Sequence, residues 1–289
     1  MDYRCVTCFR NTYRKLMEKY GLSQIQKAEF NDFFDETVRR YDEMIAPELQ
    51  IPLQRKLVEL SGVEDLYRKE KCQSNNLALS LVQYWRDAVA SSRDPFSMAA
   101  RLAIAGNIMD YGANDTFDLR KTIERVFQAE LAIDHTEKLR AAVARAKRIL
   151  YLGDNAGEIV FDKLFIETID HSNVTFITRG GATINDATLK DANDVRMQEV
   201  ATVISNGLAA PSTLLSHSSE AFLEIYRNAD LIISKGQGNL EGLIDENDPR
   251  IFFILMAKCD VIAERLNVKK GDFVISRVAQ PTPDSPLSC

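Results

Sequence analysis

Long apolar runs are absent from this sequence of 289 residues, and none reaches the roughly 20 residues that a helix needs to cross a bilayer. The first residues also lack the charged and then apolar pattern of a secretory signal peptide. Basic residues form no stripe and the net charge is -6, which argues against non-specific binding to nucleic acid. We therefore expect a cytoplasmic protein with no membrane or nucleic-acid partner. The sequence leaves its oligomeric state open.

Cysteine is scarce, with five residues, and a cytoplasmic location implies that they are reduced. Cys5 and Cys8 have the spacing of half a zinc site, but a closed structural site needs four ligands. The first half of the chain adds only Cys72 and His135. We therefore favour a weak or shared metal site, or no metal, over a closed zinc site. A thioredoxin-like redox role is not expected, because the pair does not follow a strand.

Residues that hydrolases often use as nucleophiles or bases are missing or poorly placed. No Gly-x-Ser-x-Gly elbow is present, so a serine hydrolase is not expected. The histidines occur singly in polar, turn-like segments and are expected at the surface or as caps: His135, His171 and His217. Cys259 lies in an apolar context and is expected in the core.

The first half of the sequence, residues 1–145, carries successive helical patterns and no convincing strand. The expected helices are Cys8 to Tyr20, Ser23 to Ile45, Pro47 to Ser61, Asn76 to Ser91, Pro95 to Met109, Thr116 to Gln128 and residues 137–147. Caps support several of these starts, because Ser23 and Asp115 each precede the first apolar positions of a helix.

From Arg148 onward, short β-branched runs end in polar or glycine-bearing loops. The expected strands are Arg148–Gly153, Val174–Thr178, Ala201–Ser205, Leu231–Ser234 and Phe273–Ser276, while Ile251–Ala257 is either a strand or the start of a buried helix. Strands that alternate with helices predict a mainly parallel sheet with right-handed crossovers.

The fold class is therefore expected to be α/β, with a helical N-terminal domain at residues 1–145. This domain is expected to pack on a three-layer α/β/α, Rossmann-like core at residues 146–278. Residues 279–289 are rich in Pro and Ser and are expected to form a disordered tail.

Polar side chains gather in the loops that follow the expected strands. The first strand breaks into Gly153–Glu158, which presents Asp154 and Asn155, and the loop after the second strand presents Asp186. Because the carboxyl ends of parallel strands meet at one edge of a sheet, these side chains are expected to lie together. Their oxygens suit a divalent cation such as Mg²⁺ or Mn²⁺. The haloacid-dehalogenase fold is rejected, because Ala156 stands where its second aspartate would be.

An anion site is expected at the same edge of the sheet. Lys235 is followed by Gly236 and Gly238, whose backbone N–H groups can approach a phosphate closely. Asn206 follows a neighbouring strand and is expected to bind substrate with them. A metal beside a lysine and a glycine loop suits phosphoryl chemistry, with Lys235 neutralising developing charge.

Each of these features also has a simpler interpretation. Asp154 and Asn155 are typical of a turn that caps the next helix, and Asp186 has the same property. Glu158 would interact with a helix dipole or orient Asn155. Asp162, one helical turn later, is expected at the surface or in packing. The interpretation as a site is favoured because all these loops follow strands of one sheet.

A set of motifs in this order resembles the damage-control phosphatases, also known as domain of unknown function 89. The motifs are Gly153–Glu158, Ile184–Thr188, Ala229–Glu241 and Ala257–Ala263, with Ala105–Gly112 and Lys71, Ser74 and Asn75 upstream. The likeness covers nearly the whole chain, and the Cys5–Cys8 pair resembles that of the archaeal and bacterial branch.

This resemblance implies a helical domain on an α/β core and metal-dependent hydrolysis of small phosphorylated metabolites, such as sugar phosphates or damaged cofactor-type phosphates. The cofactor would be Mg²⁺, Mn²⁺, Co²⁺ or Ni²⁺, held by Asp154, Asn155 and Asp186, and Lys235 would bind the substrate phosphate. Substrate contacts are also implied for Lys258, whose preceding residues depart from the eukaryotic motif, and for Asn107 and Asp110.

Two other functions compete with a phosphatase. An S-adenosylmethionine-dependent carboxyl methyltransferase would use a similar core, but it usually carries a glycine-rich turn where this chain has Asp154 and Asn155. A non-catalytic module that binds a phosphorylated ligand is the second alternative. The substrate, the physiological metal and the choice between attack by water and attack by a carboxylate stay open.

Overall fold

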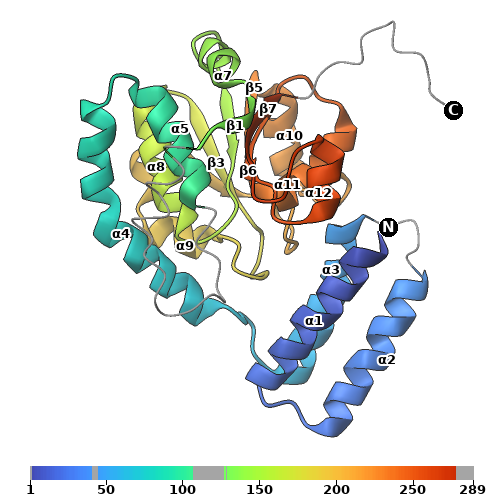
Figure 1. Ribbon diagram of the computed structural model, residues 1–289. Helices are drawn as coiled ribbons and strands as arrows, with labels where there is room; N and C mark the ends of the chain where they lie inside the picture. Colours follow the sequence, from blue (N-terminus) through green and yellow to red (C-terminus); the bar gives the residue numbers. More distant parts are fainter. Residues whose placement is uncertain (1, 41–44, 107–126, 128, 278–289) are drawn as a thin grey trace, which may run out of the picture.

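The computed structural model describes residues 2–40, 45–106, 127 and 129–277 (Figure 1). Asn107 and Asp110, the helix expected at Thr116–Gln128, except for residue 127, and the tail 279–289 lie outside the described residues. None of the described helices is long and apolar enough to span a membrane.

A single seven-stranded sheet forms the centre of the protein. Its strands are β1 (Leu131–Asp134), β2 (Ile149–Leu152), β3 (Val174–Thr178), β4 (Thr202–Ser205), β5 (Leu231–Lys235), β6 (Ile251–Met256) and β7 (Phe273–Arg277). Their order is β1-β7-β6-β5-β2-β3-β4, and every neighbouring pair is parallel except β6 with β7. The ambiguous segment at 251–257 is thus a strand, and the predicted, mainly parallel α/β fold is confirmed.

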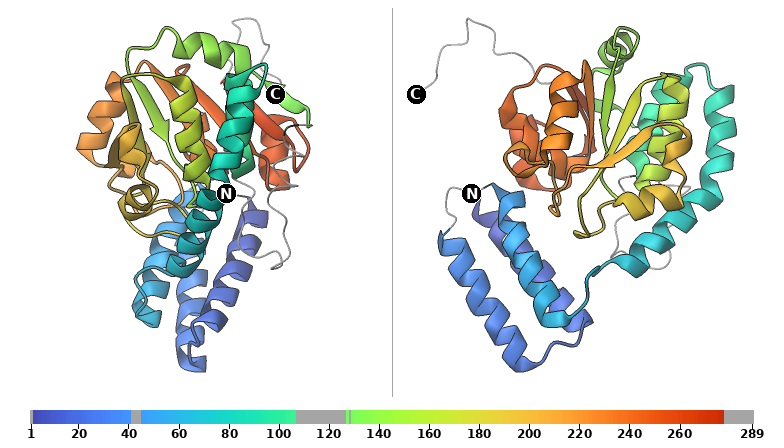
Figure 2. Two further views of the ribbon diagram at one scale, coloured as in Figure 1. Left: turned by 90° about the vertical axis from the view of Figure 1, so that its left-hand side faces the viewer. Right: turned by 180° about the vertical axis from the view of Figure 1, so that it is seen from behind.

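Helices cover both faces of the sheet (Figures 1 and 2). One face packs Tyr151 and Phe176 against α4 (Arg68–Ser91), α5 (Pro95–Gly106), α7 (Thr136–Val143), α8 (Glu158–Ile169) and α9 (Leu189–Asp194). The other face packs Leu150 and Leu152 against α10 (Glu220–Asn228), α11 (Gly236–Leu243) and α12 (Asp260–Leu266). Strands β2 and β5 are buried along their whole length, because helices cover both of their faces.

The first three helices form a separate unit with its own core. They are α1 (Tyr3–Lys19), α2 (Gln24–Arg40) and α3 (Ala46–Ser61), and they bury Phe30, Phe34, Leu49 and Leu53 among themselves. Figures 1 and 2 show this unit beyond one end of the sheet, joined to it by the chain between α3 and α4.

The packing therefore changes near residue 65 and not near residue 145 as the sequence suggested. Helices α4, α5 and α7 belong to the outer layer of the α/β core, and β1 joins the sheet by pairing with β7. Strand β1 was not predicted because it is short and its residues alternate between half-buried and exposed. Helical periodicity locates helices, but it does not say which layer they join.

A lysine and two carboxylates are buried together between the sheet and α8. The ammonium of Lys235 donates to Glu158 Oε1 at 2.6 Å and to Asp162 Oδ1 at 2.7 Å. It also donates to the carbonyl of Ala103 on α5 at 2.9 Å, and the Tyr151 hydroxyl donates to Asp162 at 2.8 Å. All three charged side chains are fully buried. This ion cluster ties β2, β5, α5 and α8 together.

Replacing Lys235 by Met should destabilise the fold severely. The change leaves two buried carboxylates without their cation, so the free energy of unfolding should fall by about 3–5 kcal/mol in urea denaturation. The matched control is Lys190→Met, which breaks an exposed pair with Asp194. The control should lose only about 0.3–0.5 kcal/mol. Similar losses in the two variants would show that the buried ion cluster does not hold the layers together.

Candidate functional site

Two loops that are distant in sequence are joined by backbone hydrogen bonds at the carboxyl edge of the sheet. The N–H of Ala187 donates to the carbonyl of Asp154 at 2.7 Å, and the N–H of Ala156 donates to the carbonyl of Asn185 at 2.9 Å. These bonds form an isolated antiparallel bridge between Asn155 and Asp186. The sequence placed both loops at this edge, and the structure brings them into direct contact.

The paired loops lie where the strand order reverses. Strand β2 has β3 on one side and β5 on the other, so the chain leaves the sheet in opposite directions after β2 and β5. In open α/β sheets, ligands bind in the crevice that this reversal creates. Asp154 follows β2 and Gly236 follows β5, so both lie at that crevice.

Arg179 holds the two carboxylates in place. Its Nε donates to Asp186 Oδ2 at 2.6 Å, and one terminal nitrogen donates to Asp154 Oδ1 at 3.2 Å. The other terminal nitrogen donates to the side-chain oxygens of Asn239 at 2.8 Å and Thr213 at 3.3 Å. This residue was not predicted from the sequence to belong to the site. Its position directly after β3 was the available signal, because a charged residue there is directed toward the crevice.

The simpler interpretation of the carboxylates as helix caps does not fit. Helix α8 has Gly157 at its N-cap, and no side chain caps it. Helix α9 is capped by Thr188 together with Asp191. Asp154 and Asp186 therefore do not serve as caps, and both carboxylates accept hydrogen bonds from Arg179.

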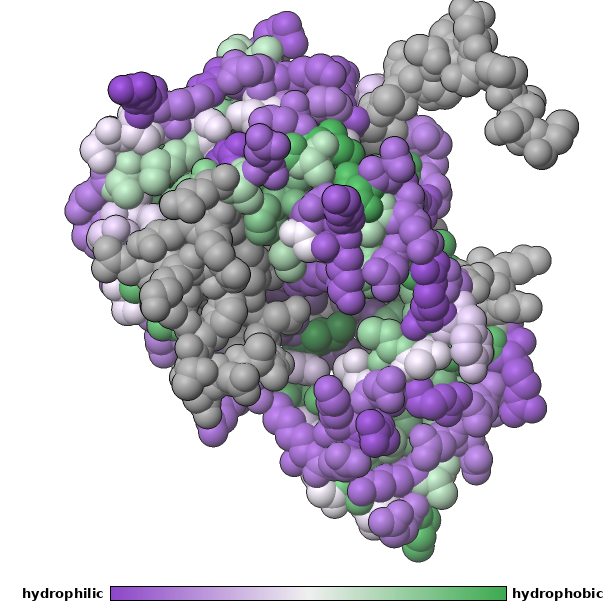
Figure 3. All heavy atoms as spheres, viewed as in Figure 1, coloured by the Kyte–Doolittle hydropathy of each residue, from purple (hydrophilic) through white to green (hydrophobic). Residues whose placement is uncertain are grey.

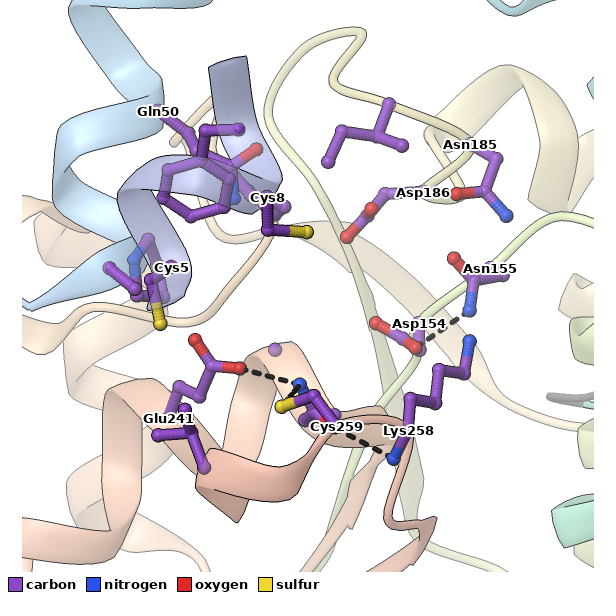
Figure 4. Close-up of a pocket in the computed structure, with 18 of the residues that line it drawn as sticks. Cys5, Cys8, Gln50, Asp154, Asn155, Asn185, Asp186, Glu241, Lys258 and Cys259 are labelled. Atoms are coloured by element: carbon purple, nitrogen blue, oxygen red, sulfur yellow. Dashed lines mark hydrogen bonds between the residues drawn. The ribbon is translucent and has the colours of Figure 1, made fainter. Parts of the chain in front are cut away.

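Glu158 fixes the orientation of Asn155. The amide nitrogen of Asn155 donates to Glu158 Oε2 at 3.2 Å and to Asp154 Oδ2 at 2.7 Å. With its NH₂ group turned toward two carboxylates, the amide presents its oxygen to the other side. Figure 4 shows this oxygen on the same side as the carboxylate of Asp186. Glu158 thus has the orienting role that was one of its two expected roles, and Lys235 in turn holds Glu158.

A pocket of about 500 Å³ opens in front of these residues. Its walls come from the α/β core and from the three-helix unit: Arg4, Cys5, Cys8, Phe9, Ala46, Pro47, Gln50, Asp154, Asn155, Ile184, Asn185, Asp186, Pro211, Gln237, Gly238, Glu241, Lys258, Cys259, Asp260 and Val261. Figure 3 shows the surface hollowed between these two parts, with hydrophobic side chains inside the hollow.

Two residues that the sequence predicted to bind substrate do not line the pocket. Lys235 does not line the pocket, because its ammonium is fully buried and is held by Glu158 and Asp162. It is therefore not assigned to substrate phosphate. Asn206 is also buried outside the pocket, where its side-chain oxygen accepts from the N–H of Gly180 at 3.1 Å.

Lys258 lines the pocket and places a positive charge near the paired carboxylates. Figure 4 shows its side chain pointing toward Asp154 and Asn155. Of the two glycines expected to cradle phosphate, Gly238 lines the pocket. Gly236 instead packs against Asp154, where an added Cβ would lie 1.9 Å from Oδ2.

Burial raises the pKa of Asp154 to about 8, with Asp186 and Glu158 adding to the effect and Arg179 and Lys258 opposing it. Burial also raises the pKa of Asp186, although Arg179 opposes the shift. Burial therefore disfavours the ionised forms of both carboxyl groups, and an added positive charge would favour them. Such an environment, with carboxylate and amide oxygens facing a pocket, fits a hard divalent cation.

The residues present would surround a metal ion only in part. No three His, Cys, Asp or Glu side chains form a metal cage anywhere in the described residues. Two carboxylates and one amide would hold an ion only in part, so substrate or water would complete its shell. Cys5, Cys8 and Cys259 line another part of the pocket, and Cys259, which was expected in the core, is only half-buried.

Substituting Gly236 by Ala should cost more stability than the same change at a glycine with free space around it. Gly236 has φ +78°, and Gly62, the matched control, has φ +68° with no atom within 4 Å of the point where a Cβ would lie. Gly62→Ala should lose about 1–2 kcal/mol for the left-handed backbone alone. Gly236→Ala should lose a further ~1–3 kcal/mol, because the methyl group displaces Asp154. Urea denaturation of both variants measures the difference, and equal losses would contradict the close approach.

Comparison with known proteins gives a consistent result. The sequence model of the family described as the damage-control phosphatase ARMT1-like domain matches residues 1–274. A damage-control phosphatase of Pyrococcus horikoshii is 32% identical over 283 residues, which cover 96% of this chain and 98% of that protein. A damage-control phosphatase of Archaeoglobus fulgidus is 33% identical over 229 residues, covering 77% of this chain and 79% of that protein.

The solved structures agree with these matches. The crystal structure of a DUF89 family protein from Pyrococcus horikoshii superposes with a TM-score of 0.87 at 30% sequence identity, covering 96% of this chain and 99% of that chain. The resemblance of the sequence motifs to the damage-control phosphatase family is confirmed. This chain belongs to the damage-control phosphatase family with the ARMT1-like domain.

Proposed function

We propose that this protein is a metal-dependent phosphatase that hydrolyses phosphomonoesters of small metabolites, such as sugar phosphates or damaged cofactor-type phosphates. One observation carries the proposal: Asp154, Asn155 and Asp186 meet at a pocket into which Lys258 also points. Membership of a family whose relatives are named damage-control phosphatases supports the same reaction.

The oxygens of Asp154, Asn155 and Asp186 would hold Mg²⁺, Mn²⁺, Co²⁺ or Ni²⁺. When bound, such an ion supplies positive charge that polarises the phosphoryl group. Arg179 keeps one oxygen of each carboxylate in a buried hydrogen bond, which restrains both side chains before any ligand arrives. Preorganised groups of this kind need little rearrangement during the reaction.

Lys258 would bind the phosphoryl oxygens from the other side and neutralise the charge that develops on them. The backbone of Gly238 lines the pocket nearby and leaves room for the substrate. The pocket volume of about 500 Å³ suits a small metabolite. The attacking group is either water or the Asp154 carboxylate, and trapping of a phospho-aspartate at Asp154 would identify the second route.

Removing a carboxylate of the site should abolish most activity. Asp154→Asn and Asp186→Asn should each lower the rate of phosphate release by about 10²-fold or more, because each loses a charge that holds the ion. Asp87→Asn, an exposed change on α4 outside the pocket, is the matched control. The assay measures phosphate release from a panel of sugar and cofactor phosphates with each of the four metals.

Chelation provides a second arm of the same assay. Wild-type activity should fall to background in excess EDTA and return when Mn²⁺ or another suitable ion is added back. Full activity in EDTA, or carboxylate variants as active as Asp87→Asn, would overturn the proposal.

Loss of the Lys258 charge should weaken catalysis without removing metal binding. Lys258→Gln should lower kcat/KM for phosphate release by about 10²–10³-fold, as expected when a charge-stabilising donor is removed. The control is Lys270→Gln, an exposed change outside the pocket. Metal affinity, followed by isothermal titration, should stay close to that of the wild type. If Lys258→Gln retains wild-type kcat/KM, another group binds the phosphoryl oxygens.

A further inference from the structure

Two carboxylates of the pocket, Glu241 and Asp260, have no part in the proposed phosphatase site, and Glu241 is the less exposed of the two. Glu241, on α11, lines the pocket together with Cys5 and Cys8 of α1 and with Cys259. Figure 4 shows Glu241 and Cys5 on the side of the pocket away from Asp154, with Cys259 between Glu241 and Lys258. The pocket therefore has two ends of different chemistry, and a ligand that fills it contacts both.

Glu241 is held in a fixed position by a neutral neighbour. The amide nitrogen of Gln237 donates to Glu241 Oε1 at 2.8 Å and to the sulfur of Cys259 at 3.5 Å. The amide oxygen of Gln237 accepts the backbone N–H of Lys258 at 3.0 Å. Both ends of Gln237 are thus engaged, which fixes its orientation and directs the Glu241 carboxylate.

No cation of the described chain forms an ion pair with Glu241. Arg265 is close enough to influence it, but the Arg265 guanidinium bonds Asp245. Arg4 also lines the pocket, and it is engaged by Glu264, at 2.7 Å to each carboxylate oxygen, and by Asp2. A carboxylate with a single neutral donor in a partly closed pocket is unfavourable until a ligand supplies positive charge.

The surroundings of Glu241 are weakly polar. Burial raises the pKa of Cys5 to about 11, and the charge of Glu241 adds to this increase. Burial also raises the pKa of Cys8. Burial therefore disfavours the charged thiolate form of both residues. Burial also raises the pKa of Glu241 itself. Within the described residues, no three of these side chains form a metal cage.

We propose that Glu241 recognises a protonated amine at the end of the substrate remote from its phosphate. The inference rests on the proposed phosphatase function and adds a substrate class, the phosphomonoesters that carry an ammonium group. In such a ligand the phosphate lies near Lys258, and the ammonium group donates to Glu241 in a charge-assisted hydrogen bond. A polyol phosphate offers only neutral hydroxyls and leaves the carboxylate without a counter-charge.

The test compares ω-aminoalkyl phosphates of increasing chain length with uncharged alkyl phosphates of matched length. Wild type should show a kcat/KM for the best aminoalkyl phosphate that exceeds its uncharged match by about ten- to hundred-fold, mainly through KM. E241Q keeps the shape of the side chain and should bring this ratio close to one. D260N, an exposed carboxylate change at the same pocket, is the control and should keep the wild-type ratio.

A second measurement needs no variant. Alkylamines without phosphate should inhibit wild type competitively, while the matched alcohols should not. Equal kcat/KM for both ester series, or an unchanged ratio in E241Q, would overturn the role of Glu241 while leaving the phosphatase intact. Failure of wild type to release phosphate from either series or from p-nitrophenyl phosphate would instead overturn the proposed function.

Discussion

The backbone pairing of Asn155 with Asp186 is the constraint on which the rest of the site depends. Each loop leaves a different strand, and the hydrogen bonds between them set the separation of their carboxylates before any ligand binds. Arg179 then spans both carboxylates from beneath. Backbone hydrogen bonds and a buried guanidinium are stiff connections, so the oxygens that face the pocket have little freedom to move apart.

This arrangement gathers charge in a region that would otherwise exclude it. Four carboxylates, Asp154, Glu158, Asp162 and Asp186, are buried beside the fully buried cations Arg179 and Lys235. Each cation contacts two of the carboxylates, so the layers of the fold and the floor of the crevice share one electrostatic network. Stability and function are coupled here, because a change in the supporting ion cluster reaches Asn155 through Glu158.

The sequence predicted the strands and the loops that carry the site, because buried strands and polar turns leave strong local signals. The meeting of Asp154, Asn155 and Asp186 at one edge of the sheet was predicted in this way. The sequence could not show which of Lys235 and Lys258 lines the pocket, because both follow strands near glycine or polar turns. Only the packing of α8 shows that Lys235 is directed into the core. Residue 145 was likewise a poor boundary, because layer membership depends on contacts between distant segments.

The three-helix unit has its own core, yet its first and third helices form a wall of the pocket. A unit of this kind can open separately from the rest of the protein, with a free energy below that of global unfolding. A bound molecule that touches both walls would suppress such opening. Amide protons in the interior of α1 and α3 would then exchange with solvent more slowly, so occupancy of the crevice could be read from helices that carry none of its carboxylates.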